Sequence, residues 1–431
     1  MSPMLPDLPV EIIALISEFS SIAAVVALSQ TNRRIHSICF RYIYRVVELE
    51  DSARAVKWST TLATNNPYAQ EVRKLKLLCH ISCEHSRRRF NATFHSALSN
   101  LKNLENLHLS TPHLGILPCF SDAHFPKLRI CSLPLSLYTD PFVRRHPGLI
   151  SLYVLPEQYH MQISSTPPDI SAAEIRLPNL RTFIGPETFA FKVVPHSSAS
   201  RISVMWNTRR LLLCNLSSDI ATLALSRTEI LTLDNIVGIW DTSLLSAIVA
   251  GLPHLLKLGF WNVSVPNSDS QNIFVSRLDV AVANLPGLTS LSVLQSPLRA
   301  PGLLNPRDLD AEFDTVRRWG SIAPTLRSAV LPSETAWARV YARDNVWYPA
   351  TKSPNIPDML IRVAWFLRRV VSSSDSDSDL GPGYARVAED VAGKDTLSVL
   401  RAEFERLGRM PEFAIAPSVR GMSISFPVPA A

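Results

Sequence analysis

The chain has 431 residues, of which 46% are hydrophobic and 19% are charged, a balance typical of a globular protein that is too long for one compact core. Its formal net charge is +6, but lysine and arginine are scattered and only Arg87-Arg88-Arg89 forms a run, which argues against a nucleic-acid-binding stripe. Glycine is scarce, with 14 residues against 32 prolines, which argues against folds built on phosphate-binding loops and favours frequent, similar turns.

The sequence predicts an intracellular protein, cytoplasmic or nuclear, that does not bind a membrane. Asp7 and Glu11 stand where a secretory leader would be basic and then apolar. The longest uncharged stretches, such as 19–32 and 242–256, are shorter than the roughly 20 residues that span a bilayer. The six cysteines are therefore expected to be reduced thiols.

Three short amphipathic helices are predicted before residue 45. The first opens with Asp7 as a candidate cap and with Pro9 in its first turn, where a missing N–H costs nothing. The second follows Ser21, and the third runs from Asn32 to Tyr44. Two stripes at helical spacing are Ile12, Leu15, Ile16 and Phe19 in the first helix, and Ile35, Ile38, Cys39 and Tyr42 in the third. So small a unit buries its apolar faces poorly, and we expect it to need a partner.

The same residues resemble an F-box, the motif that docks on the Skp adaptor of cullin-based ubiquitin ligases. The resemblance lies in the order Leu-Pro-x-Glu-Ile from Leu8, a Phe at the end of the first helix, a small-residue helix ending at Leu28-Ser29, and Thr31-Asn32-Arg33-Arg34. The chain departs from the usual motif in lacking the Cys and Trp often found near residues 30–34. The adaptor-binding residues that the resemblance implies are Leu8, Pro9, Glu11, Ile12, Ile16 and Leu28. The alternative is a helical hairpin that only caps a larger domain.

A strand signal recurs after Tyr44. Arg45 to Leu49 alternates like a strand, and residues 50–64 favour a helix. A motif of the form Leu-Pro-x-Leu-x-x-Leu-x-Leu then returns, mostly in steps of 21 to 38 residues, with a degenerate member at Thr228 to Leu233. The leucines that precede its strands are Leu104, Leu128, Leu149, Leu180, Leu255, Leu288 and Leu326. Each copy would bury alternate side chains and pair in parallel with the next copy.

These copies resemble irregular leucine-rich repeats, and an F-box followed by such repeats is similar to the large F-box sets of mushroom-forming fungi. The resemblance covers residues 5–49 and, more loosely, 69–337. It implies an α/β fold in which a three-helix F-box precedes a leucine-rich-repeat solenoid, with parallel strands on the concave face and helices, such as 243–250 and 274–284, on the convex face. A generic α/β domain is the alternative.

The predicted domains follow from these signals and from the tail. Aromatic residues between 332 and 371 favour a cap for the last repeat, and Ser372 to Asp379 has the composition of a disordered acidic segment. The domains are 1–48, an F-box-like helical domain; 49–335, the solenoid; 336–371, its cap; 372–384, a disordered acidic Ser/Asp loop; and 385–431, a helix and loose tail.

No catalytic residue, metal site or cofactor is predicted. Cys79-His80-x-x-Cys83-x-His85 holds four potential metal ligands, but its spacing does not match a paired zinc knuckle. No phosphate-binding loop, nucleophile elbow or kinase signature occurs, and Gly381-Pro382-Gly383 favours a turn. The sequence therefore predicts a protein that is not an enzyme.

Three functional hypotheses remain. The first is a substrate-recognition subunit that binds the Skp-type adaptor and, through it, cullin, and that holds an unknown target protein on its repeats. Side chains between the buried strand leucines should line the concave face, which gives the target-binding candidates His108, Ser132, Tyr153, Thr232, Gly259, Trp261 and Ser292. The second is a repeat scaffold without a ligase, whose N-terminal helices only cap the solenoid. The third, a hydrolase, would need a pocket with strongly shifted titratable groups.

Overall fold

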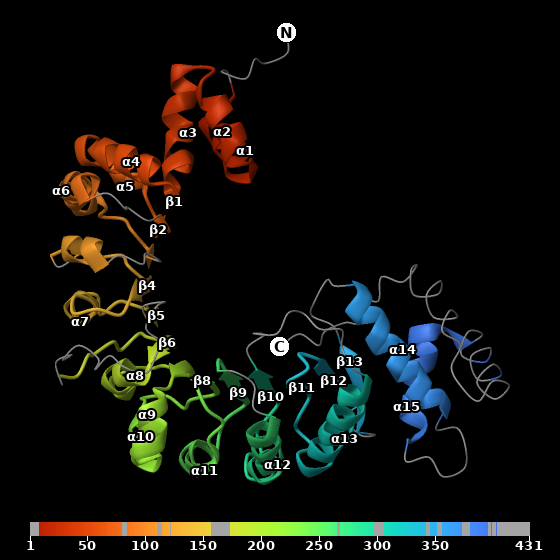
Figure 1. Ribbon diagram of the computed structural model, residues 1–431. Coiled ribbons are helices and arrows are strands. Elements are labelled where there is room, and N and C mark those ends of the chain that lie inside the picture. Colours follow the sequence, from red (N-terminus) through yellow and green to blue (C-terminus); the bar gives the residue numbers. More distant parts are fainter. Residues whose placement is uncertain are drawn as a thin grey trace. The chain divides into compact units, whose positions relative to one another are not determined.

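The structure, a computed structural model, describes residues 8–79, 84–109, 114–120, 122–156, 173–264, 268–295, 306–341, 345–350, 356–372, 380–394, 398 and 402. In this part the chain is mixed α/β, with mostly parallel strands and accompanying helices (Figure 1). It divides into two compact units: Met1–Arg210 with Ala221–Ile230, and Leu211–Ile220 with Leu231–Ala431. The division differs from the predicted domains, because the N-terminal helices belong to the same unit as the first strands. Asp7, His80, Cys83, the segment 373–379 and the part of the predicted tail after residue 394, apart from residues 398 and 402, lie outside the described residues.

The first unit contains a parallel sheet whose strands follow chain order. Its strands are β1 (Val46–Leu49), β2 (Lys74–Leu77), β3 (Asn106–Leu109), β4 (Ile130–Pro134), β5 (Ser151–Leu155), β6 (Thr182–Pro186) and β7 (Arg201–Met205). Its helices are α1 (Val10–Phe19), α2 (Ile22–Ser29), α3 (Arg33–Arg45), α4 (Ser52–Thr64), α5 (Asn66–Glu71), α6 (Glu84–Asn100), η2 (Leu114–Phe120), α7 (Thr139–Arg144), α8 (Glu187–Val193) and η3 (Val194–His196). Figure 1 shows α4, α6, α7 and α8 on one side of the strands.

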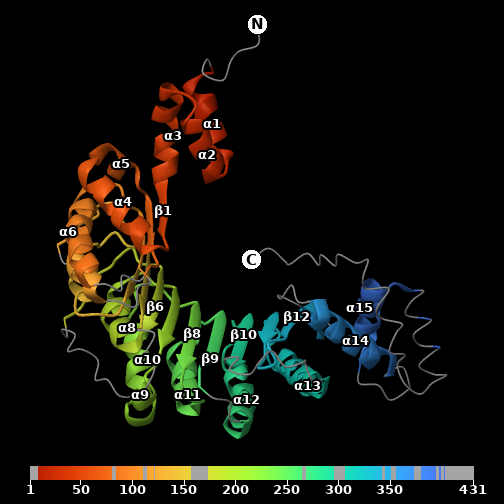
Figure 2. The ribbon, with the colours of Figure 1, turned by 45° about the horizontal axis from the view of Figure 1, so that its top comes forward.

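The second unit begins with four parallel strands and ends with an antiparallel hairpin. Its strands are β8 (Thr232–Val237), β9 (Lys257–Asn262), β10 (Ser290–Gln295), β11 (Ser328–Val330), β12 (Ala336–Tyr341) and β13 (Val346–Ala350). Its helices are α11 (Thr242–Gly251), α12 (Ser268–Ala283), α13 (Pro306–Ile322), α14 (Ile356–Ser372) and α15 (Pro382–Ala392). Two short helices, α9 (Thr208–Leu213) and α10 (Leu216–Ala224), are divided between the units. Figure 2 shows α11 and α12 on the same side of β8–β10.

A turn of constant form precedes the strand in each predicted copy of the motif. The N–H of the anchor leucine donates to the carbonyl three residues earlier, as from Leu104 to Leu101 at 3.3 Å and from Leu288 to Leu285 at 3.0 Å. The same bond occurs at Leu128, Leu149, Leu180, Leu255 and Leu326. In most copies proline is the second residue of this turn, the place in a type I turn that suits its fixed φ. The next N–H reaches the preceding copy, as from Glu105 to the carbonyl of Arg73 at 2.8 Å, so the turn also sets the register.

Burial alternates along β1, β2, β3, β5, β6, β8 and β10, as expected for a sheet covered on one face. Leu75 and Leu77 of β2, like Leu107 and Leu109 of β3, are buried, and the residues between them are more accessible. The accessible positions form the face opposite the helices, which we call the open face.

The last strands of the second unit differ from the parallel repeat that precedes them. β12 pairs antiparallel with β11 and with β13, and α13, α14 and α15 contact β13. Helix α15 begins at Pro382, and Gly383 and Tyr384 are buried. The predicted turn at 381–383 is therefore the start of a helix, and the predicted acidic loop cannot extend to residue 384. Proline suits the first position of a helix, where no N–H is needed.

The three N-terminal helices enclose a small core of Ile13, Val25, Ile35, Ile38 and Cys39. The buried side of α1 consists of Ile13 and Ser17, and the Ser17 hydroxyl donates to the carbonyl of Ile13 at 2.8 Å. Pro9 is the residue that caps α1 and does not lie within its first turn.

Low pH should destabilise the first unit through His146, which begins the turn before β5 and bonds to Phe125, the first residue of the turn before β4. Its Nε2 accepts the N–H of Phe125 at 2.9 Å, and its Nδ1 donates to the carbonyl of Phe142 at 2.8 Å, so only the neutral ring satisfies both bonds. Burial lowers the pKa of His146 to about 4, with smaller contributions from nearby charges, while the bond to Phe142 opposes the shift.

Because this pKa lies below the unfolded value of about 6.5, the stabilisation is complete above that pH and is lost as the pH falls towards 4. We expect the free energy of unfolding to fall by about 2 kcal/mol between pH 7 and pH 5, measured by urea unfolding. His146→Gln, which keeps an acceptor but does not titrate, should lose most of that dependence. An equal pH dependence in both proteins would contradict the assignment.

Candidate functional site

Helix α1 carries a row of apolar side chains that the three-helix core leaves exposed. Ile12 is 42% exposed, Leu15 49% and Ile16 37%, while Phe19 reaches 85%. Ile22, at the start of α2, is 53% exposed and continues the row in sequence. The four residues of α1, which we call the α1 face, recur three or four positions apart along the helix, so they share one side of it. Clustered apolar exposure of this kind marks surfaces that contact a partner.

The predicted adaptor-binding residues separate into two groups. Ile12 and Ile16 belong to the α1 face, and Pro9 and Glu11 are exposed beside it. Leu8 and Leu28 are only partly exposed and pack against the core of the three helices. The list of adaptor-binding residues omitted Leu15 and Phe19, although the helical spacing that identifies Ile12 and Ile16 extends to them.

A second feature is a hollow of about 430 Å³ on the open face of the first unit. It extends over β1 to β5, and the residues that line it occupy two rows of strand partners. One row is Val46, Lys74, Asn106 and Ile130, and the other is Glu48, Lys76, His108, Ser132 and Tyr153. The volume lies within the about 300–1,000 Å³ typical of ligand sites.

Charge is concentrated on the first strands of the hollow. Lys76 forms an ion pair with Glu48, whose carboxylate lies 3.8 Å from its Nζ. Lys74 has no ion-pair partner within the described residues. Burial and the neighbouring Lys76 ammonium lower the pKa of His108, so its imidazole is uncharged at neutral pH and offers one donor and one acceptor. Beyond β3 the lining is apolar or hydroxylic, from Ile130, Ser132, Tyr153 and Leu155.

Three predicted target-binding residues line this one hollow: His108, Ser132 and Tyr153. Their neighbours two positions along each strand, such as Asn106, Ile130 and Leu155, line it as well. The prediction missed these neighbours, although the two-residue period of a strand places them on the same face.

The other four predicted residues belong to the second unit. Thr232 and Ser292 are partly exposed, and Trp261 is 47% exposed. Gly259 is buried and leaves room for its neighbours, because a Cβ there would lie 2.2 Å from Oδ1 of Asp234 and 2.9 Å from Oγ of Ser292. Burial raises the pKa of this Asp234 carboxyl, and the nearby Lys257 opposes the shift.

The described residues also bear on metal ligands and on membrane-spanning helices. Within the described residues, no group of three His, Cys, Asp or Glu side chains is placed to hold a metal ion. Cys79 of the candidate zinc motif is buried, and His80 and Cys83 lie outside the described residues. In the same described part of the chain, every helix is too short or too polar to cross a membrane.

The α1 face and the hollow on the open face are therefore two candidate contact surfaces within the described residues. Comparison with known proteins does not identify a relative: no family model matches the chain, and no curated protein matches it either.

Proposed function

We propose that this protein is a substrate-recognition subunit of a Skp–cullin–F-box ubiquitin ligase. In this proposal α1–α3 form an F-box that binds the Skp-type adaptor, the strand–helix repeats form a leucine-rich-repeat solenoid, and the protein acts in the cytoplasm or nucleus. The subunit makes and breaks no bond itself. It raises the effective concentration of target lysines near a ubiquitin-charged enzyme.

The observation that carries the proposal is the α1 face. A helical unit that has its own core, and still presents Ile12, Ile16 and Phe19 to solvent, has an apolar surface in excess of what its fold needs. An amphipathic helix of this kind suits a hydrophobic groove on a partner. Aromatic side chains such as Phe19 contribute strongly at the centre of such contacts.

The test is a pull-down of the full chain with purified Skp-type adaptor, with Ile12→Asp/Phe19→Asp as the variant. Both side chains are exposed, so the charges should leave the core of the three helices intact. We expect the variant to bind at least about tenfold more weakly, since two desolvated apolar contacts would become charged.

A matched control places the same charges on an apolar surface elsewhere. Ile273 and Val280 of α12 are 59% and 61% exposed, and Ile273→Asp/Val280→Asp should bind the adaptor like the wild type. A folded wild-type chain that binds no adaptor would overturn the proposal.

One contact favours the alternative of a repeat scaffold without a ligase. The rings of Tyr44 in α3 and Tyr68 in α5 stack with centroids 4.7 Å apart, and Phe40 lies 5.4 Å from the same ring. Helix α3 therefore packs on α5 of the same unit, as a cap would. A helical cap does not need the exposed apolar side chains of the α1 face, however, so we prefer the proposal of a substrate-recognition subunit.

A further inference from the structure

The hollow on the open face is long and narrow. Its two rows of residues cross five strands, from Val46 and Glu48 on β1 to Tyr153 on β5. With strands about 4.8 Å apart, it extends over roughly 19 Å. That length matches about six residues of extended chain, at about 3.3 Å per residue, so the shape favours a peptide segment over a compact small molecule.

One part of the hollow favours an acidic group. Lys74 and Lys76 are adjacent on the open face of β2, and the Glu48 carboxylate neutralises one of the two. The remaining cation is Lys74, which is exposed and faces the solvent side of the hollow. A ligand carboxylate placed here would gain a charge-assisted hydrogen bond.

The opposite part favours a large apolar side chain. Ile130 is 38% exposed on β4, and Tyr153 and Leu155 of β5 lie two and four positions further along the paired strand. Ser132, the strand partner of Tyr153, is 5% exposed. Its short side chain makes the hollow deeper at this position than at the larger side chains around it. The middle of the hollow, at Asn106 and His108, offers side chains that can pair with a peptide backbone.

We propose that the hollow binds an extended segment of a target protein in which an acidic and an aromatic side chain lie three or four positions apart. The spacing follows from the two to three strand intervals, about 10–14 Å, between β2 and β4 or β5. This inference rests on the proposed function, because it describes the segment of the target protein that would bind on the open face.

A spacing scan tests it. Fluorescein-labelled peptides that carry one Asp and one Phe in an Ala/Ser background, in both orders and with zero to six residues between them, are titrated with the full chain and followed by fluorescence anisotropy. We expect the tightest binding with two or three intervening residues. Replacing either the Asp or the Phe by Ser should weaken binding about tenfold.

Charge reversal provides the second arm. Lys74→Glu/Lys76→Glu should lose binding of the best peptide and gain about tenfold for its Lys-for-Asp counterpart. Lys102→Glu/Lys127→Glu, which changes two exposed lysines in the turns before β3 and β4, should bind like the wild type.

Three results would overturn the inference: binding independent of spacing, unchanged binding in the β2 variant, or displacement of the peptide by free 4-phenylbutyrate at the peptide's own concentration. The last result would assign the hollow to a small molecule. The β2 variant should still bind the adaptor, so a failure here differs from a failure of the proposed function, in which the wild type binds no adaptor.

Discussion

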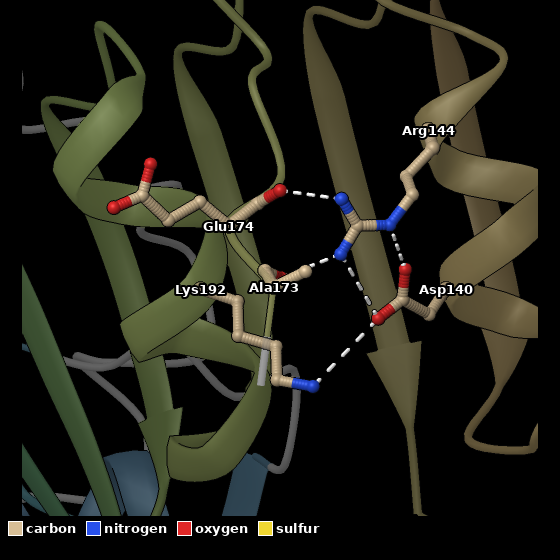
Figure 3. A network of polar contacts seen from close by, with 5 residues as sticks. All are labelled: Asp140, Arg144, Ala173, Glu174 and Lys192. Atoms are coloured by element: carbon tan, nitrogen blue, oxygen red, sulfur yellow. Dashed lines mark hydrogen bonds and ion pairs between the residues drawn. The ribbon is translucent and has the colours of Figure 1, made fainter. Parts of the chain in front are cut away.

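Replacing Asp140 by alanine is expected to lower the free energy of unfolding by about 3–5 kcal/mol, the range for breaking a buried ion pair by removing one partner. Asp140 is 5% exposed in the first turn of α7 and binds two cations (Figure 3). Its Oδ1 accepts from Nε of Arg144, and its Oδ2 lies 3.7 Å from Nζ of Lys192 in α8. The same Arg144 donates to the carbonyls of Ala173 and Glu174, both at 2.5 Å. The Asp140 carboxylate therefore connects α7 with α8, and Arg144 connects α7 with the chain that leads to β6.

The control is an ion pair of nearly equal length in the same unit. Glu48 and Lys76 are 3.8 Å apart, but their side chains are 51% and 40% exposed, against 7% and 12% for Asp140 and Lys192. Glu48→Ala should therefore cost less than about 1 kcal/mol in urea unfolding. Equal losses in the free energy of unfolding for Asp140→Ala and Glu48→Ala would show that burial does not make the Asp140 ion pair more stabilising than an exposed one.

The repeated strands could be predicted from the sequence because their signal is local. An anchor such as Leu104 or Leu288 ends a tight turn and begins a strand, and both events depend on a few consecutive residues. The strand β7 was missed because Arg201 to Met205 has the alternation of a strand but no preceding Leu-Pro-x-Leu. The hairpin β12–β13 was missed because it also lacks the repeated motif: its strands pair antiparallel, whereas the repeated strands pair in parallel.

The sites could be predicted less well, because each depends on what lies beside it. Helix α1 has apolar residues on two sides, and only the packing of α2 and α3 decides that Ile13 is buried while Ile12 and Ile16 are exposed. The open-face position of His108 and Tyr153 followed from strand period, but the hollow depends on the small Ser132 standing in register between larger neighbours. Register across several strands is set by all the intervening turns.

The largest single loss in the second unit is expected at Trp337, where the sheet changes from parallel to antiparallel. Its side chain is fully buried on β12, with ring centroids 5.8 Å from Phe313 of α13 and 5.5 Å from Trp365 of α14. Its Nε1 donates at 3.1 Å to Glu312, a buried carboxyl that also accepts from the N–H and hydroxyl of Ser333. We expect Trp337→Ala to lower the free energy of unfolding by about 3–5 kcal/mol in urea.

A series of variants separates packing from hydrogen bonding at this position. Trp337→Phe keeps most of the ring contacts and loses the bond to Glu312, so it should cost about 1–3 kcal/mol. Burial already raises the pKa of Glu312, and the bonds from Ser333 and Trp337 oppose that shift, so removal of the indole donor should raise the pKa further. Trp261→Ala, on β9 of the same unit but with a side chain 47% exposed, is the control and should cost less than about 1 kcal/mol. If Trp337→Phe costs as much as Trp337→Ala, the bond to the buried carboxyl, and not the aromatic packing, holds α13 against the last strands.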